Sequence, residues 1–240
     1  MNFDLSGEQE QIRDSVRKFA ASADRRALRS ADGGYSLDRW RDMAELGLLA
    51  LAVPENAGGM GGSAIDLAVV AEALGYEIAP DPWLENGVLP ARLLAAAGRA
   101  DLIESAVSGE TFFAFAFAER ARRFSLEPRG VAIEAVAGID EVRGEKTFVS
   151  GGALAAQLLV LADRKGEPTI VTVPAASAGD RSPALSPGRW QHRVRAALQP
   201  GSAGRGLRAR HRRSGIGRRG RAGPAAGGRR DARPGPAPVR

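Results

Sequence analysis

The chain of 240 residues changes composition abruptly near residue 180, and this break limits which part of it can fold. Residues 1–180 hold 18 basic and 27 acidic side chains, a net charge of −9. Residues 181–240 hold 16 arginines, no lysine and a single acid, Asp231, with 11 glycines and 7 prolines, a net charge of +15. Such a segment buries too little apolar surface to offset the entropy lost on ordering. We therefore predict a folded, acidic part up to residue 180, then a disordered Arg/Gly/Pro-rich tail over residues 181–240.

The numbers and positions of cysteine and histidine limit the kinds of catalytic and metal site that the chain can form. The chain contains no cysteine, and both histidines, His192 and His211, lie beyond residue 180. Disulfides and thiolate metal sites are therefore excluded. The part predicted to fold also lacks the residues for Ser-His or Cys-His catalysis and for histidine-ligated metal. We expect no metal, and chemistry that uses carboxylates, Lys, Tyr, Ser or a bound cofactor.

The first hundred residues carry the apolar spacing and capping signals of helices. Ser6 and Gln9 form a capping box ahead of an apolar face, and Ser63 and Asp66 cap another helix. Further helices are predicted at residues 36–47, 88–97 and 101–107. We interpret residues 1–110 as a helical domain.

The period of the sequence changes to two at residue 113. Phe113, Phe115 and Phe117 alternate with small alanines, which is typical of a strand with one core-facing side. Further strands are predicted at residues 131–136, 146–149, 157–161 and 169–173, with turns at Gly138, Gly144, Gly151-Gly152 and residues 164–166. The second domain, residues 111–180, is thus a small all-β domain, and helices followed by strands give an α+β fold class.

Two motifs stand out. Residues 53–63 read Val-Pro-Glu-Asn-Ala-Gly-Gly-Met-Gly-Gly-Ser, and four glycines in five positions predict unusual backbone angles or a close approach to another group; taken alone, this stretch could also be a flexible linker. Residues 144–152 read Gly-Glu-Lys-Thr-Phe-Val-Ser-Gly-Gly. Together with the opening Leu-Ser-Gly-Glu-Gln at residues 5–9, and in this order, they resemble the acyl-CoA dehydrogenase family over about residues 3–180.

The resemblance implies a fold and an activity. Family members have a helical N-terminal domain, a small β-barrel domain that holds FAD, and a C-terminal four-helix bundle. They oxidise an acyl-CoA to the trans-2-enoyl-CoA: a carboxylate removes the α-proton, and the β-hydrogen leaves as hydride to the flavin. The implied partners are an acyl-CoA substrate, an electron-transfer flavoprotein and further subunits in a homo- or hetero-oligomer. The polar first ten residues and the short apolar runs predict a cytoplasmic protein without membrane contact.

The resemblance also assigns cofactor-binding residues, all in the β domain. Phe148 stands where an aromatic side chain covers the flavin ring, and Ser150 where a hydroxyl or amide meets the flavin N5 edge. The full set is Phe115, Phe117, Ala118, Glu119, Phe148, Val149 and Ser150. The phenylalanine stripe is equally the core face of a strand. Glu119 is a candidate base, but we expect an exposed strand-end carboxylate there, solvated or paired with Arg, and assign no catalytic residue.

The chain departs from the family pattern in two places. Arg123 and Phe124 occupy the family's Gly and Ser positions and Ala118 replaces a Thr, as in divergent members such as the smaller subunits of two-subunit acyl-CoA dehydrogenases. The family's bundle, which carries the catalytic carboxylate, would begin after residue 180. An Arg-Gly-Ala-Pro tail is typical of G+C-rich DNA read out of frame, so we interpret residues 181–240 as the product of a frameshift and expect the chain to be inactive.

Two other functions fit parts of the sequence. The chain could be a non-catalytic subunit that pairs with a complete dehydrogenase. The basic tail could instead bind nucleic acid through phosphate charge and arginine stacking. Interleaved Tyr and Phe are absent from the tail, where Trp190 is the only aromatic residue, and this disfavours nucleic-acid binding.

Overall fold

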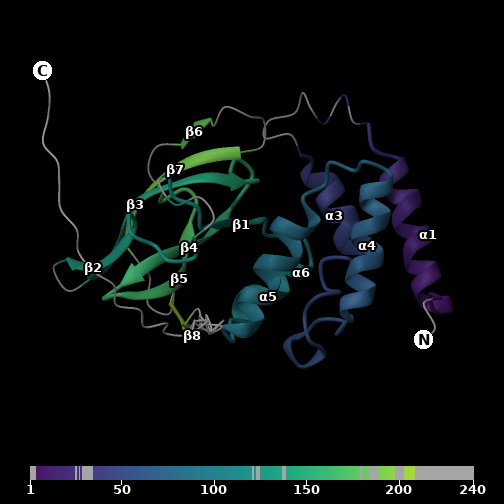
Figure 1. Ribbon diagram of the computed structural model, residues 1–240, viewed down its shortest axis with the longest axis horizontal. Helices are drawn as coiled ribbons and strands as arrows, with labels where there is room; N and C mark the ends of the chain where they lie inside the picture. Colours follow the sequence, from purple (N-terminus) through teal and green to yellow (C-terminus); the bar gives the residue numbers. More distant parts are fainter. Residues whose placement is uncertain are drawn as a thin grey trace, which may run out of the picture. The chain divides into compact units, whose positions relative to one another are not determined.

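The structure is a computed structural model whose helices precede its strands, so the predicted α+β class is confirmed (Figure 1). It describes residues 4–24, 26, 28, 35–120, 122, 125–136 and 139–178, and the backbone of residues 181–183, 189–197 and 203–208. All of them belong to one compact unit. No helix within these ranges is long and apolar enough to cross a membrane.

The elements follow the predicted order closely. The helical elements are α1 (Gly7–Ala21), α3 (Leu37–Glu45), the 3₁₀ turn η2 (Glu55–Ala57), α4 (Ala64–Tyr76), the π-helix η3 (Trp83–Val88), α5 (Leu89–Ala96) and α6 (Ala100–Val107). The strands are β1 (Phe113–Ala116), β2 (Ala132–Val136), β3 (Ile139–Ser150), β4 (Gln157–Arg164), β5 (Glu167–Pro174), β6 (Arg181–Pro183), β7 (Arg189–Ala197) and β8 (Ala203–Arg208). The predicted boundary at residue 110 falls in the turn between α6 and β1.

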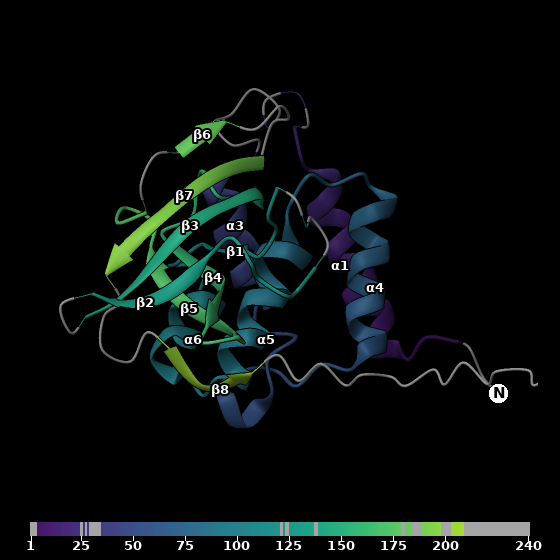
Figure 2. The ribbon, with the colours of Figure 1, turned by 60° about the vertical axis from the view of Figure 1, so that its left-hand side comes forward.

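The two predicted capping boxes are confirmed, and they touch each other. Ser6 Oγ accepts from the Gln9 amide at 3.2 Å, and Ser63 Oγ accepts from the Asp66 amide at 3.2 Å. Gln9 Nε2 then donates to Asp66 Oδ1 at 2.9 Å. Hydrogen bonds from Gln9 and Ser63 lower the pKa of Asp66. The caps therefore align the starts of α1 and α4, which run side by side in Figures 1 and 2.

The strands form one mixed sheet in the order β6-β7-β3-β2-β4-β5-β8, and β1 pairs in parallel with β4 (Figure 2). β3 is longer than predicted, and the turn expected at Gly144 is wrong because that residue lies inside the strand. Gly144 has φ 141°, and a Cβ there would lie 2.2 Å from the carbonyl oxygen of Gly130. The glycine serves a close approach of two backbone segments rather than a chain reversal.

Alternation along β1 divides the core between two faces. Ala114 and Ala116 join a cluster that includes side chains of α1, α3 and α4 and the inner residues of β2–β5. Phe113 joins a second cluster with side chains of α5 and α6, against which Phe115 and Phe117 pack half-buried. The phenylalanine stripe is thus a core face, as its period predicts.

The prediction of a tail without regular structure from residue 181 is wrong for three segments. β7 pairs antiparallel with β3, β6 pairs with β7, and β8 pairs with β5. Backbone pairing at an open sheet edge needs no apolar composition, and for this reason the charge count could not exclude it. Residues 209–240 lie outside the described residues, so disorder there stays a prediction.

The glycine-rich motif packs against its own preceding segment. The amides of Met60, Gly61 and Gly62 donate to the carbonyls of Ala50, Val53 and Leu51 at 3.0, 2.8 and 2.8 Å. A Cβ on Gly59 would lie 2.2 Å from Val53 O, and Gly58 and Gly61 have φ 85° and 65°. The predicted close approach and unusual angles are confirmed, and the group approached is the chain itself.

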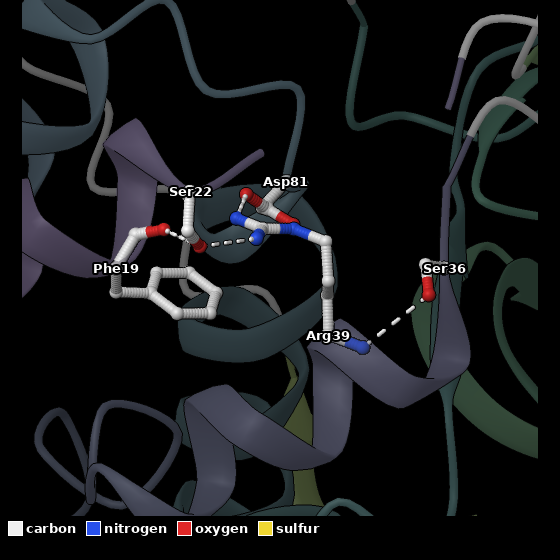
Figure 3. A network of polar contacts seen from close by, with 5 residues as sticks. All are labelled: Phe19, Ser22, Ser36, Arg39 and Asp81. Carbon is white, nitrogen blue, oxygen red and sulfur yellow. Dashed lines mark hydrogen bonds and ion pairs between the residues drawn. The ribbon is translucent and has the colours of Figure 1, made fainter. Parts of the chain in front are cut away.

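A partly buried arginine joins three parts of the helical domain (Figure 3). Arg39 on α3 makes a bidentate ion pair with Asp81, at 3.0 and 2.7 Å, and a 3.3 Å hydrogen bond to Ser22 Oγ after α1. Its guanidinium lies 4.2 Å from the centre of the Phe19 ring. The two charged side chains are only 13% and 5% exposed, so each depends on the other for solvation.

We predict that Arg39→Ala lowers the free energy of unfolding by about 2–4 kcal/mol, because it leaves the Asp81 carboxylate buried and unpaired. Arg41→Ala is the matched control, since Arg41 pairs with Asp38 on the exposed face of the same helix and should cost less than about 1 kcal/mol. Chemical denaturation of the three proteins measures both; equal costs would contradict the role assigned to the Arg39 network.

Candidate functional site

The candidate site lies where the segment after β1 meets the end of β3. We call these segments the β1 end (residues 117–119) and the β3 end (residues 146–151). The Thr147 amide donates to the Ala118 carbonyl at 2.9 Å. Lys146 Nζ donates to the Phe117 carbonyl at 3.1 Å and to Glu119 Oε1 at 2.9 Å. Two stretches that the sequence assigned to one cofactor are thereby brought together.

Glu119 is buried, which corrects the exposed carboxylate that we expected. It is 7% exposed, and its partner is Lys146 rather than an arginine. Its other oxygen, Oε2, accepts from the amides of Arg129 and Gly130 at 3.1 and 2.8 Å. The segment that returns to begin β2 covers the carboxylate, and this contact between distant residues has no local sequence signal.

The electrostatics keep Glu119 ionised. Burial raises the pKa of Glu119, but hydrogen bonds from Lys146, Gly130 and Arg129 and the lysine charge outweigh burial and hold it below the ordinary value. Burial lowers the pKa of Lys146, and the hydrogen bond and charge of Glu119 oppose that shift. A carboxylate with a lowered pKa and both oxygens occupied is a poor base, so Glu119 is a structural group.

Phe148 has the most unusual backbone of the site. It has φ 55° and is 40% exposed, whereas Lys146, Thr147 and Val149 beside it are buried. The pairing of β3 with β7 shifts register between Lys146 and Val149. A bulky residue with positive φ is strained, at a cost of about 1–3 kcal/mol, and such strain gathers at functional sites. The bulge turns an aromatic ring outward from a strand whose neighbouring side chains face the core.

The other predicted cofactor residues differ in what they expose. Val149 and Ala118 are 1% and 4% exposed, and their carbonyls accept hydrogen bonds from the amides of Gly152 and Thr147. Ser150 is half-buried, with its Oγ 3.5 Å from the Tyr35 hydroxyl. Phe115 and Phe117 stack on each other with centroids 5.3 Å apart and belong to the second core cluster. Their contact with a cofactor stays a prediction.

Sequence reasoning missed two residues near the site. Tyr35 reaches Ser150 from the segment before α3. Asn86, in the π-helix η3, is buried and donates to the carbonyls of Phe113 and Ser150. Asn86 follows another polar residue, Glu85, in the stretch 83–90, so no local sequence signal marks it. Arg123 and Phe124, at the family's Gly-Ser positions, lie outside the described residues.

The chemistry of these groups fits a flat, hydrogen-bonding ring. Phe148 is 40% exposed, and its aromatic side chain could stack on a planar ligand. Ser150 offers a hydroxyl two residues further along. Thr147 Oγ1 is buried and has no hydrogen-bond partner among the described residues, so it is a further group that a ligand or water could satisfy. Phe148 and Ser150 are thus the residues that could hold the isoalloxazine of FAD.

Known proteins agree with this picture. Residues 6–104 match the family described as acyl-CoA dehydrogenase, N-terminal domain. Acyl-CoA dehydrogenase IpdE2 of Mycobacterium tuberculosis is 39% identical over 89 residues, which are 37% of this chain and 28% of that protein. The crystal structure of the ChsE4-ChsE5 complex from Mycobacterium tuberculosis superposes with a TM-score of 0.73 at 22% identity, covering 85% of this chain and 58% of that one. Acyl-CoA dehydrogenase complexed with FAD from Bacillus anthracis superposes with a TM-score of 0.70 at 23% identity, covering 83% and 37%.

These comparisons support different conclusions. At 22% and 23% identity the solved structures show the fold alone, whereas the family match rests on the sequence of the helical domain. The chain spans little more than a quarter of IpdE2 and little more than half of the ChsE4-ChsE5 chain that it matches.

We predict that Lys146 and Glu119 are strongly coupled. Lys146→Met leaves a buried carboxylate without its cation and should lower the free energy of unfolding by about 3–5 kcal/mol. The double variant Lys146→Met/Glu119→Gln should be more stable than Lys146→Met, because the neutral amide needs no counter-charge. A double-mutant cycle by chemical denaturation measures the coupling, expected at about 1–3 kcal/mol; simple additivity would contradict the buried pair.

We also predict an acid-dependent stability from Glu119. Because its folded pKa lies below the ordinary value, its contribution is fully present above the pKa of an unfolded glutamate and is lost as pH falls through the folded pKa. The stability difference between the wild type and Glu119→Gln should therefore shrink between about pH 6 and pH 3. Denaturation at stepped pH measures this difference, with exposed Glu72→Gln as the control; a difference that grows toward acid would reverse the assigned sign.

Proposed function

This chain belongs to the acyl-CoA dehydrogenase family, and from that premise we propose that its folded part is a flavin-binding element of such an enzyme. The proposed cofactor is FAD, held at the β1 end and the β3 end. The proposed reaction of the assembled enzyme is the α,β-dehydrogenation of an acyl-CoA thioester. We further propose that it works in the cytoplasm, with an electron-transfer flavoprotein as acceptor.

The observation that carries this proposal is the strained, outward ring of Phe148. An aromatic side chain that gains burial from its own fold needs no positive φ. Phe148 keeps the strained backbone and remains 40% exposed, so part of its surface is open to a ligand. A planar ligand stacked on the ring would recover apolar burial at that place. The FAD-complexed structure from Bacillus anthracis shares the fold and supports this assignment.

The residues of the site divide the work of binding. When bound, FAD supplies the hydride acceptor, which no amino-acid side chain can replace. Phe148 would cover the ring and Ser150 would hydrogen-bond its edge, while the Lys146–Glu119 pair holds both backbone segments in place. Thr147 and Val149, on either side of Phe148, are buried.

The same geometry argues against turnover by this chain alone. Removal of an α-proton needs a carboxylate that can accept it, and Glu119 is ionised but occupied by a lysine and two amides. We propose that the base comes from a segment or subunit other than the described residues, and that the isolated chain is inactive.

A second candidate follows from that gap. The chain could serve as a non-catalytic partner subunit in a heteromeric dehydrogenase. The ChsE4-ChsE5 structure and the structure titled Tcur3481-Tcur3483 steroid ACAD, both similar in fold, each name two proteins. In this case the chain would stabilise a partner that holds the cofactor and the base. Flavin binding by the purified chain separates the two candidates.

We predict that the purified chain binds FAD and that Phe148→Ala and Phe148→Gly both weaken it by about 3- to 10-fold, the value of one aromatic contact. Without ligand, Phe148→Gly should be more stable than Phe148→Ala by about 1 kcal/mol, because only glycine is unstrained at positive φ. Flavin fluorescence titration and chemical denaturation measure the two effects, with Ile139→Ala on the same strand as the exposed apolar control.

These outcomes are separable. Equal stability of the glycine and alanine variants would show that the backbone at residue 148 is not strained. Absence of FAD binding in the wild type would sink the cofactor assignment and favour the partner-subunit candidate.

A further inference from the structure

We propose that Asn86 is a positioning residue by which the helical domain fixes the end of β3, and with it the ring of Phe148. Its consequence for flavin binding rests on the function proposed above; its consequence for the backbone does not. The assignment begins from one side chain that bonds both strands of the site. We call Asn86 with the carbonyls of Phe113 and Ser150 the Asn86 clamp.

The clamp uses both hydrogens of a single amide. Asn86 Nδ2 lies 2.8 Å from the Phe113 carbonyl oxygen and 3.0 Å from the Ser150 carbonyl oxygen. Phe113 begins β1 and Ser150 ends β3, so one amide from the helical domain joins the two strands that carry the candidate site. Asn86 is 3% exposed, and water therefore competes little for these bonds.

The carbonyl oxygen of the Asn86 side chain, in contrast to its amide nitrogen, makes no hydrogen bond to a described residue. This atom, Oδ1, is buried. A buried polar atom without a partner is destabilising, and leucine in its place would avoid that cost. The two donated hydrogen bonds are what the amide contributes at this position. Aspartate, which has no hydrogen to donate when ionised, and serine, which has one, cannot make both.

The π-helix places the amide deep in the fold. η3 spans only residues 83–88, and Trp83 at its start donates from Nε1 to the Leu48 carbonyl at 2.9 Å. Trp83, Asn86, Gly87 and Val88 are all buried. π-helical turns are rare and recur at functional sites. Here the turn is anchored by Trp83 at one end and directs Asn86 to the strand carbonyls at the other.

Gly151 makes room for the clamp. It has φ 64°, and a Cβ there would lie 2.8 Å from Asn86 Nδ2 and 2.7 Å from Cε1 of Phe112. Any larger residue would push the β3 end off the amide. The sequence predicts only a turn at Gly151-Gly152. The structure adds that residue 151 must be a glycine because Asn86 and Phe112 pack against it.

The clamp and the buried ion pair bracket Phe148. Lys146, two residues before it, is tied to the β1 end. Ser150, two residues after it, is tied to η3 through Asn86. A strained residue between two fixed points cannot relax, whereas release of either point lets the turn leave the αL conformation. Asn86 therefore acts on the ring through the backbone and touches no ligand.

The test compares Asn86→Asp and Asn86→Ser with Asn56→Asp, the same chemical change on the exposed turn η2. Hydrogen exchange, which needs no flavin, should show amides at residues 147–152 exchanging at least about tenfold faster in both Asn86 variants than in the wild type at matched overall stability. Val70→Ala, in the core of the helical domain, supplies the matched loss of stability. Gly151→Ala should give the same local effect, and Gly75→Ala, which has open space around it, should not.

If Asn86→Asp does not fold, Asn86→Ser and Gly151→Ala decide the result. Exchange at residues 147–152 that rises no more than in Val70→Ala overturns the proposal. FAD affinity should fall about 3- to 10-fold in the Asn86 variants, as for loss of the Phe148 ring. A wild type that binds no FAD sinks the proposed function, while the exchange measurement still decides the clamp. A wild type that binds FAD, with Asn86 variants that bind equally well, overturns the positioning role alone.

Discussion

The candidate site depends on one buried ion pair between residues far apart in the chain. Lys146 is fully buried and Glu119 nearly so, and burying two charges is unfavourable unless every hydrogen-bonding group finds a partner. Here the lysine bonds a carboxylate oxygen and the Phe117 carbonyl, and the second carboxylate oxygen accepts two backbone amides. These bonds require the β1 end, the β3 end and the start of β2 to meet in one arrangement. The main effect of the ion pair is to fix how these three segments meet, and its net contribution to the free energy of unfolding is secondary.

That constraint explains how a strained backbone persists at Phe148. A positive φ at a bulky residue would relax if either flank were loose. The ion pair holds the preceding side, and Asn86 holds the following side from a different domain. The helical domain therefore acts on the site through the Asn86 amide and the Tyr35 hydroxyl. Its own arrangement is held by the capping boxes of α1 and α4 and by the Arg39 network. In this way the helical domain influences the position of the Phe148 ring through the backbone of β3.

Short-range sequence patterns correctly predicted the structural features that depend only on neighbouring residues. Ser6 with Gln9, Ser63 with Asp66 and the alternating phenylalanines each act within a few residues, so capping and period were sufficient to find them. Gly144 was misread because a glycine that permits close backbone approach and a glycine that permits a turn look alike in sequence. Glu119 was misread because its burial depends on residues 129, 130 and 146. Asn86 has no pattern at all, since its partners are carbonyls, which every residue carries. The strands β6–β8 follow from open sheet edges rather than from their own side chains.

The division between binding and chemistry follows from the same contacts. A group that positions a backbone by ionic hydrogen bonds must stay ionised and occupied, and a general base must be able to take up a proton; one carboxylate cannot do both. Glu119 is committed to the first role by Lys146 and two amides. Under the proposed function, the turn that would hold the flavin and the base come from separate parts of the assembled enzyme. The chain covers 58% of the ChsE4-ChsE5 chain that it resembles in fold. On that proposal, a flavin site stabilised independently of the base could be completed by a covalently attached domain or by another subunit, because neither would need to reshape it.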